Sequence, residues 1–347
     1  MTNNLTELRL PAEWEKSELV IMAWPHGNTD WAYMLDDVRR CFIDIVAAIS
    51  HHAEVLIVAP DPREALETIA THHDINVSAV RLAAVDTNDT WARDFGPITM
   101  LDASGRRHFL DFRFNGWGLK FAADRDNLIT RQLHEAGFLD GRLVNRLSFV
   151  LEGGSIESDG RGLILTTSEC LSSPNRNGQL SYPEITEYLK TQFCASTVLS
   201  LDHGALIGDD TDSHIDTLAR LAPGDTILYV KCSDTSDPQF EGLDAMERQL
   251  RTFTSPDGRP FNLIGLPMPD PIVIDGERLP ATYANFLVVN DAVLLPVYGQ
   301  PQKDRLAEQM LRIPYPDHKI IPVNCVPLIR QHGSLHCMTM QVPAGHT

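Results

Sequence analysis

The stretch TYANFLVVNDAVLLPVYGQPQKDRLAEQMLRIPYPDHKIIPV, residues 282–323, carries the pattern that decides the fold. Two runs rich in β-branched and apolar residues flank the turn Asn290-Asp291, a composition typical of a hairpin. A segment from about residue 303 to residue 311 then has the apolar spacing of a helix, and residues 319–323 form a third apolar run. The stretch therefore predicts one unit in the order strand, strand, helix, strand.

The same order of elements recurs earlier in the chain. The units begin near residues 98, 155, 215 and 282, at intervals of roughly 60 residues, which indicates an internally repeated architecture. The runs LVIMAW (19–24) and EVLIVA (54–59) fit a fifth unit that lacks one hairpin strand, and the C-terminal run LHCMTMQV (335–342) can supply it. We therefore predict an α/β fold in which five ββαβ-type units form the blades of a pseudo-symmetric α/β-propeller.

Length and composition set further limits. The chain has 347 residues, of which 43% are hydrophobic, and no linker-like tract divides it, so we expect one domain over residues 1–347. The 29 Lys and Arg residues against 47 Asp and Glu residues give a formal net charge of −18, which disfavours nucleic acid and anionic membranes as partners. No apolar run reaches the ~18 residues of a membrane span, and the N-terminus lacks the pattern of a signal peptide, so we expect a cytoplasmic protein.

Polar clusters stand directly before the first strand of several units. They are TWARDFGP (90–97), LEGGS (151–155) and DDTDSHID (209–216), and the predicted C-terminal strand adds Cys337. Because repeated units present equivalent loops at the same end, we expect these clusters to meet in one acidic pocket that contains a thiol and an imidazole. Cys337 by itself fits a nucleophile, a metal ligand or a buried apolar side chain, and the other five cysteines have the scattered spacing of reduced thiols.

Five motifs occur in an order that resembles a known family. They are TWARDFGP, FNGWG (114–118), LEGGS, TDSHID (211–216) and HGSLHCMT (332–339). The chain resembles the agmatine deiminase and Porphyromonas-type peptidylarginine deiminase family of the guanidine-modifying superfamily over nearly its whole length. This resemblance implies the five-bladed pentein fold. The chain departs from the agmatine deiminase pattern at Ser213 and His332, where glycine is usual.

The resemblance implies a cysteine hydrolase that converts a guanidinium into a urea and releases ammonia, with no metal and no other cofactor. Cys337 matches the nucleophile that forms an amidino-thioether, and His214 matches the acid for the leaving ammonia and then the base for water. Glu152 matches the carboxylate that orients this imidazole through its far ring nitrogen. Asp94 and Asp216 match the two guanidinium-binding aspartates, since a carboxylate complements a planar fork of N–H donors.

The acidic pocket affects the nucleophile. Nearby carboxylates disfavour a thiolate, so we expect the pKa of Cys337 to lie above its usual value of about 8.5 in the free protein. A bound guanidinium supplies the missing positive charge. We therefore expect the substrate to help ionise Cys337.

Surplus acid around the motifs favours a small cationic guanidine as the partner, with agmatine first. Asp210 is the candidate for binding its distal ammonium, and the product would then be N-carbamoylputrescine, on a route to putrescine. Trp91 and Trp117 are candidates for pocket walls, and Arg93 and Gly153 from the motif loops complete the substrate-binding candidates. A homo-oligomer such as a dimer is compatible with the sequence.

Three alternatives stay open. Peptidylarginine is the second substrate candidate, because the family includes enzymes that act on it. His332, His336 and Cys337 have workable spacing for zinc or another transition metal, which leaves a metal-dependent amidinohydrolase as a rival. A non-catalytic binder of cationic ligands is the third alternative.

Overall fold

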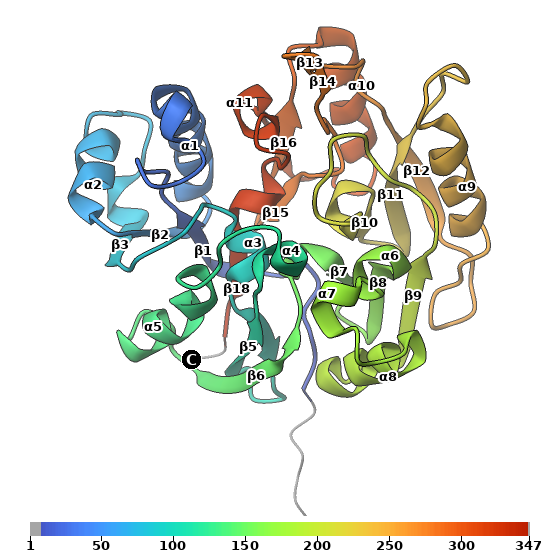
Figure 1. Cartoon of the computed structure of the whole chain (residues 1–347), viewed down its shortest axis with the longest axis horizontal. Helices are drawn as coiled ribbons and strands as arrows, with labels where there is room; N and C mark the ends of the chain where they lie inside the picture. Colours follow the sequence, from blue (N-terminus) through green and yellow to red (C-terminus); the bar gives the residue numbers. More distant parts are fainter. Residues whose placement is uncertain (1–7, 346–347) are drawn as a thin grey trace, which may run out of the picture.

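The described part of the chain contains five sheets of three or four strands (Figure 1). The computed structural model describes residues 8–345. In four of these sheets an antiparallel hairpin is followed by a strand that runs parallel to its second strand. The strands are β4 (Ile98–Leu101), β5 (Arg107–Arg113) and β6 (Arg142–Val150); β7 (Ile156–Ser158), β8 (Leu163–Thr167) and β9 (Thr197–Leu201); β10 (Ala219–Ala222), β11 (Thr226–Lys231) and β12 (Asn262–Pro267); and β15 (Leu287–Val289), β16 (Ala292–Val297) and β17 (Lys319–Asn324).

A helix connects the second and third strands of each of these sheets. The helices are α5 (Ile129–Glu135), α8 (Tyr182–Phe193), α9 (Phe240–Leu250) and α10 (Pro301–Leu311). The order predicted for residues 282–323 is thus confirmed. Its hairpin turns at Asn290, whose φ of 53° lies in the left-handed region that asparagine tolerates. Helix α10 begins earlier than predicted, at Pro301, because proline suits the first helical turn, where its missing N–H would have no partner.

The remaining large sheet joins the two ends of the chain. Its strands, in spatial order, are β18 (Met340–Pro343), β1 (Ser17–Ala23), β2 (Glu54–Ala59) and β3 (Val80–Ala84). Strand β18 pairs antiparallel with β1, with Met340 opposite Ile21. The prediction that the C-terminus supplies the strand missing from the first unit is therefore confirmed. Strand β3, which lies parallel to β2, is an addition that the repeat did not predict.

Cys337 lies in a turn, whereas the sequence predicted it within the C-terminal strand. It belongs to the short 3-10 helix η6 (His336–Met338), which ends before β18 begins. The backbone N–H and the hydroxyl of Thr339 both donate to the carbonyl of His336, at 3.1 and 3.0 Å. These local hydrogen bonds form a tight turn. The apolar run of residues 335–342 had instead suggested an extended strand.

Shorter elements complete the structure. Helices α1 (Leu35–Ser50) and α2 (Pro62–Ala70) connect the strands of the first sheet, and the proline-rich segment holds a small hairpin of β13 (Val273–Ile274) and β14 (Glu277–Arg278). Five helices of four residues each are α3 (Ala92–Phe95), α4 (Gly116–Leu119), α6 (Ser168–Leu171), α7 (Pro174–Asn177) and α11 (Val326–Ile329). No helix in residues 8–345 combines the length and the apolar character that crossing a membrane requires.

The first strand of each unit is more buried than its last strand. Strands β4, β10 and β15 are buried at every position, whereas β6 and β17 expose several residues. The longer helices pack one apolar face on the sheets, as α8 does with Ile185, Leu189 and Phe193. The loops that enter the first strands therefore gather in the interior where the units meet, and Figure 1 shows the sheets placed around α3 and α4.

Candidate active site

Chain segments that directly precede first strands meet in one buried cluster. Helix α3 precedes β4, and the short 3-10 helices η4 (Gly153–Ser155), η5 (Ile215–Thr217) and η6 precede β7, β10 and β18. The backbone N–H of Gly154 donates to Asp94 Oδ1 at 3.0 Å, and Cys337 Sγ lies 3.9 Å from Asp216 Oδ2. The structure thus brings together the polar clusters that the sequence singled out.

Asp94 is held by donors on both of its carboxylate oxygens. Besides the bond from Gly154, the indole Nε1–H of Trp117 donates to Asp94 Oδ2 at 2.9 Å. Trp117 has a φ of 54° between Gly116 and Gly118, which are also left-handed, and a Cβ on Gly116 would come within 2.2 Å of a backbone oxygen. This tight turn directs the indole to Asp94. Burial raises the pKa of Asp94 above its usual value.

His214 lies beside Asp94, with Nδ1 3.6 Å from Asp94 Oδ1. Burial alone would lower the pKa of His214, but the carboxylate of Asp94, with contributions from Cys170 and Glu152, raises it well above the usual value. Within the described part of the chain, His214 Nε2 is buried without a hydrogen-bond partner. A protonated imidazole at this position is suited to give a proton to a leaving group.

Glu152 lies close to His214 but is held by another residue. The nearest ligand atoms of Glu152, Cys170 and His214 lie within 4.8 Å of one another. Both Glu152 oxygens accept from Arg176 Nε, at 2.9 and 3.0 Å, and residues 8–345 contain no hydrogen bond between Glu152 and the His214 ring. Where the sequence predicted a carboxylate that binds the far imidazole nitrogen, the structure shows a buried ion pair. Arg176 on α7 also donates to Asp212 Oδ2 at 2.5 Å, and nothing in the sequence pattern indicated this partner.

Asp216 and Cys337 complete the cluster. Asp216 Oδ2 accepts from His336 Nδ1 at 2.8 Å, while Asp216 Oδ1 is buried with no partner among the described residues. Although burial alone would raise the pKa of Asp216, the hydrogen bond from His336 holds it below the usual value. Burial, followed by the charges of Asp216 and Asp94, raises the pKa of Cys337 well above its ordinary value, which agrees with the direction expected from the sequence.

Asn285 is a member of the cluster that the sequence analysis missed. Its Oδ1 accepts from the backbone N–H of Cys337 at 3.3 Å and lies 3.4 Å from Cys337 Sγ. Its Nδ2 donates to the backbone carbonyl of Asp216 at 3.3 Å. Asn285 lies two residues before β15, the first strand of the last unit. Its position in the repeat was therefore the sequence signal that could have identified it.

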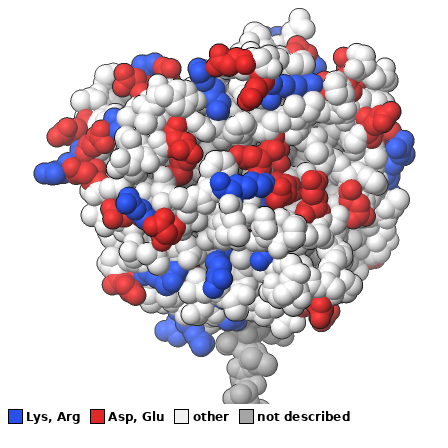
Figure 2. Space-filling model, in the orientation of Figure 1, with Lys and Arg blue, Asp and Glu red and all other residues white. Residues whose placement is uncertain are grey.

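A cavity leads from this cluster to the surface. Its inner end is lined by Cys337, Asp94, Trp91 and Trp117, and its outer part includes three further carboxylates, from Asp30, Asp89 and Asp210. Burial raises the pKa of Asp89 to about 7 and that of Asp210 to about 6. Figure 2 shows Asp and Glu side chains gathered near the centre of the face drawn in Figure 1, beside α4. The cavity is therefore suited to a ligand with positive charge at both ends.

Comparison with known proteins decides the family. The family model for Porphyromonas-type peptidyl-arginine deiminase matches residues 9–343. The chain belongs to this family. A Porphyromonas gingivalis structure provisionally named an arginine deiminase is 48% identical, with a TM-score of 0.92 over 98% of this chain and 99% of that one. A cysteine-to-serine variant of C. jejuni agmatine deiminase with substrate bound is 35% identical, with a TM-score of 0.91 over 99% of each chain. A Legionella pneumophila protein provisionally named an agmatine deiminase is 33% identical over 97% of this chain and 95% of its own length.

Two of the candidate substrate-binding residues, Arg93 and Gly153, do not line the cavity that contains Cys337. Arg93 donates from Nε to the carbonyl of His336 at 3.4 Å and from Nη2 to Gln341, and it lines a second cavity together with Gly153. Successive residues of a helix point about 100° apart, so Arg93 faces away from the cluster when Asp94 faces it. The glycine that touches the cluster is Gly154, where a Cβ would lie 2.8 Å from Asp94 Oδ1.

The three metal-ligand candidates from the sequence, His332, His336 and Cys337, do not come together around one point in the structure. His336 uses Nδ1 to bind Asp216 and Nε2 to bind Glu13, both at 2.8 Å. His332 Nδ1 donates to the carbonyl of Gly208 at 2.7 Å. Among the described residues, His332, His336 and Cys337 do not form a group that could hold one metal ion.

Proposed function

We propose that this protein hydrolyses the guanidinium of a small cationic substrate to a ureido group with release of ammonia, and that Cys337 is the nucleophile. One observation carries the proposal. The buried thiol of Cys337 lies 3.9 Å from Asp216 Oδ2 and lines one cavity together with Asp94, and Asp216 Oδ1 has no partner within residues 8–345. A planar guanidinium carries the positive charge that favours two nearby carboxylates and an N–H donor for Asp216 Oδ1.

The geometry supports a sequence of chemical steps. The bound guanidinium offsets the negative charge of Asp94 and Asp216, which favours ionisation of Cys337. The thiolate attacks the central carbon, and His214 donates its proton to the departing ammonia, which leaves an amidino-thioether. Neutral His214 then takes a proton from water, whose oxygen adds to the same carbon. Breakage of the C–S bond releases the urea and returns the thiol.

Agmatine is the substrate that the outer part of the cavity favours. Asp30, Asp89 and Asp210 can receive a distal ammonium, and the described lining of the cavity contains no Lys or Arg that could pair with the carboxylate of free arginine. The product would be N-carbamoylputrescine. Peptidylarginine is the second candidate, because the family model that matches residues 9–343 is that of the Porphyromonas-type peptidyl-arginine deiminase.

We also propose that the five units form the blades of one pentein propeller, a single catalytic domain. Four units share one topology, β18 completes the first sheet, and the segments before the first strands meet at a common cluster. Under this proposal the reaction centre lies at the axis of the propeller.

The test is an ammonia assay with agmatine, free arginine and a blocked arginyl peptide at matched concentrations. We expect agmatine to react fastest and Cys337→Ser to retain less than a few per cent of its turnover. Mass spectrometry of quenched wild-type protein is expected to show an adduct on the peptide that contains Cys337. Release of ammonia by Cys337→Ser at the wild-type rate would overturn the assignment of the nucleophile, whereas a faster reaction with the peptide would overturn the substrate.

A further inference from the structure

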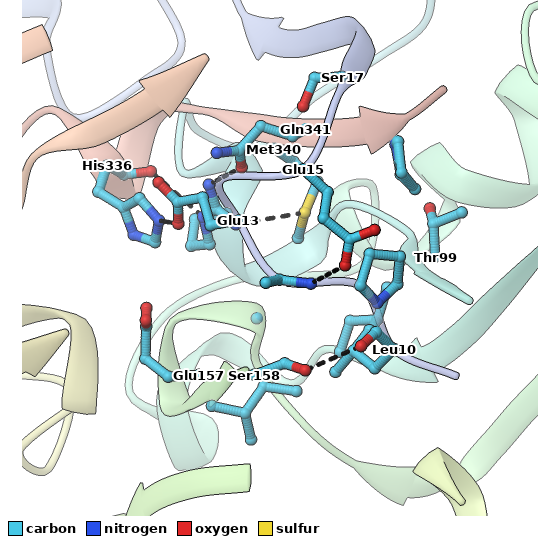
Figure 3. Close-up of a pocket in the computed structure, with 17 residues that line it drawn as sticks. Leu10, Glu13, Glu15, Ser17, Thr99, Glu157, Ser158, His336, Met340 and Gln341 are labelled. Carbon is cyan, nitrogen blue, oxygen red and sulfur yellow. Dashed lines mark hydrogen bonds and ion pairs between the residues drawn. The ribbon is translucent and has the colours of Figure 1, made fainter. Parts of the chain in front are cut away.

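A second cavity lies on the other side of the η6 turn from the Cys337 cavity. None of the residues that line it also lines the first cavity. Its lining includes Glu13 and Glu15 from the N-terminal segment, Glu157 from β7 and His336 from η6. Figure 3 shows the carboxylate of Glu13 pointing toward the imidazole of His336. The reaction proposed above gives this cavity no role.

A continuous chain of polar contacts connects Cys337 to the second cavity. Cys337 Sγ lies 3.9 Å from Asp216 Oδ2, which accepts from His336 Nδ1 at 2.8 Å. On the far side of the ring, His336 Nε2 lies 2.8 Å from Glu13 Oε2. Asp216 and His336 are buried, whereas the side chain of Glu13 is 12% exposed. Carboxylate, imidazole and carboxylate thus follow one another from the thiol to solvent.

We propose that Asp216, His336 and Glu13 form a relay that takes up the thiol proton of Cys337 at Asp216 and releases a proton from Glu13 into the second cavity when substrate binds. The proposal rests on the proposed function. While the substrate fills the first cavity, this chain of contacts lets Asp216 take up the thiol proton as Glu13 releases a proton to solvent. His214 does not offer a site for that proton, because it is placed beside Asp94 to hold the proton that ammonia needs.

The proton balance closes over one turnover. As the S–C bond forms, the S–H bond breaks and its proton passes to Asp216 Oδ2. His336 keeps the Nδ1 proton that it donates to Asp216 and gives its Nε2 proton to Glu13, which releases a proton to solvent. His214 gives its own proton to the leaving group, so ammonia departs as neutral NH₃. Water later returns one proton to His214 and gives the other to solvent, Asp216 returns its proton to Cys337, and Glu13 takes a proton from solvent to restore His336 Nε2. The released proton and NH₃ together equal the ammonium ion of the overall reaction.

The charges around His336 suit this role. They come from Asp216 on η5, Glu13 in the N-terminal segment and Arg220 on β10, whose Nη2 lies 3.1 Å from His336 Nε2. Arg220 also binds Glu157 through Nε at 2.6 Å. Although burial alone would raise the pKa of Glu13, Arg220 and His336 hold it well below the usual value. Glu13 is therefore anionic and returns to that state after each transfer.

The test compares Glu13→Gln with the matched variant Glu15→Gln. Glu15 lines the same cavity and pairs with Arg9 at 2.6 Å, but it lies outside the chain of contacts. Each protein is mixed with agmatine in weak buffer with a pH indicator, and proton release is followed through the first turnover. We expect wild type to release its proton as the adduct forms. Glu13→Gln is expected to slow proton release and kcat together by at least about tenfold, whereas Glu15→Gln stays within about twofold of wild type.

A binding measurement separates proton transfer from a structural role. The Cys337→Ser background is used to measure agmatine affinity with and without Glu13→Gln, and we expect the two affinities to agree within about threefold. A larger loss of affinity, or wild-type proton release by Glu13→Gln, would overturn the relay. Absence of ammonia from wild type with every guanidine would instead overturn the proposed function itself.

Discussion

Arg176→Met is the perturbation whose effect follows most directly from the structure. Arg176 donates through Nε to both oxygens of Glu152, through Nη1 to Asp212 and through Nη2 to the carbonyl of Thr211. The side chains of Arg176 and Glu152 are only 2% and 1% exposed. Methionine has a similar length but no donor. The variant therefore leaves the Glu152 carboxylate buried, with no other hydrogen-bond donor among the described residues.

The magnitude follows from the cost of an unpaired buried charge. Removal of one partner from a buried ion pair lowers the free energy of unfolding by about 3–5 kcal/mol, which is a large part of the ~5–15 kcal/mol of a typical domain. Arg251→Met is the matched control, since Arg251 pairs with Glu247 at 2.5 Å but is 61% exposed. We expect the control to lose less than about 1 kcal/mol.

Urea unfolding followed by tryptophan fluorescence measures both variants. Adding Glu152→Gln to Arg176→Met removes the unpaired charge, so we expect the double variant to be more stable than Arg176→Met alone. Equal stability of Arg176→Met and Arg251→Met would refute the reasoning. So would a double variant that is no more stable than Arg176→Met, because the loss would then not come from the Glu152 charge.

Three further predictions concern the site. Asp94→Asn and Asp216→Asn should each cost at least ~3 kcal/mol of transition-state stabilisation in kcat/KM with agmatine; near-normal values in both would place the pocket elsewhere. Because Asp94 raises the pKa of His214 in the folded protein, the stability from this pair is fully present below the unfolded value of about 6.5 and is lost as pH rises through the folded pKa. Urea unfolding of Asp94→Asn should lack this loss at high pH, and an unchanged dependence would contradict the pairing. Asp210→Asn should lower kcat/KM for agmatine by about tenfold more than for an uncharged alkylguanidine; an equal loss for both would remove Asp210 from recognition of the distal amine.

The repeated architecture was predictable from local patterns. Apolar runs, turn residues and helical spacing recur at similar intervals, and each is set by residues close together in the chain. The pairing of β18 with β1 was predictable because the first unit visibly lacked a strand. The η6 turn was not predictable from the sequence. The hydrogen bonds of Thr339 to the carbonyl of His336 favour a turn over extended structure, and an apolar run does not reveal them.

The side-chain partners of the site were less predictable. The ion pair of Glu152 with Arg176 and the contact of His336 with Glu13 depend on how separate units pack. Glu13 and His336 are 323 positions apart in the sequence. No sequence motif spans both Glu13 and His336, so their contact becomes visible only in the folded structure.

Asn285 shows that position within the repeat carries information that motifs miss. Like Asp94, Asp216 and Cys337, it lies two to four residues before the first strand of a sheet or the strand that completes one. Its amide is also the right chemistry for that position. Asn285 Oδ1 lies 3.4 Å from Cys337 Sγ, and a carboxylate there would add a third negative charge near a thiol whose pKa Asp216 and Asp94 already raise. A neutral acceptor orients Cys337 without opposing its ionisation further. The repeat therefore sets where the last unit contributes a residue, and the charges of Asp94 and Asp216 limit which residue suits that position.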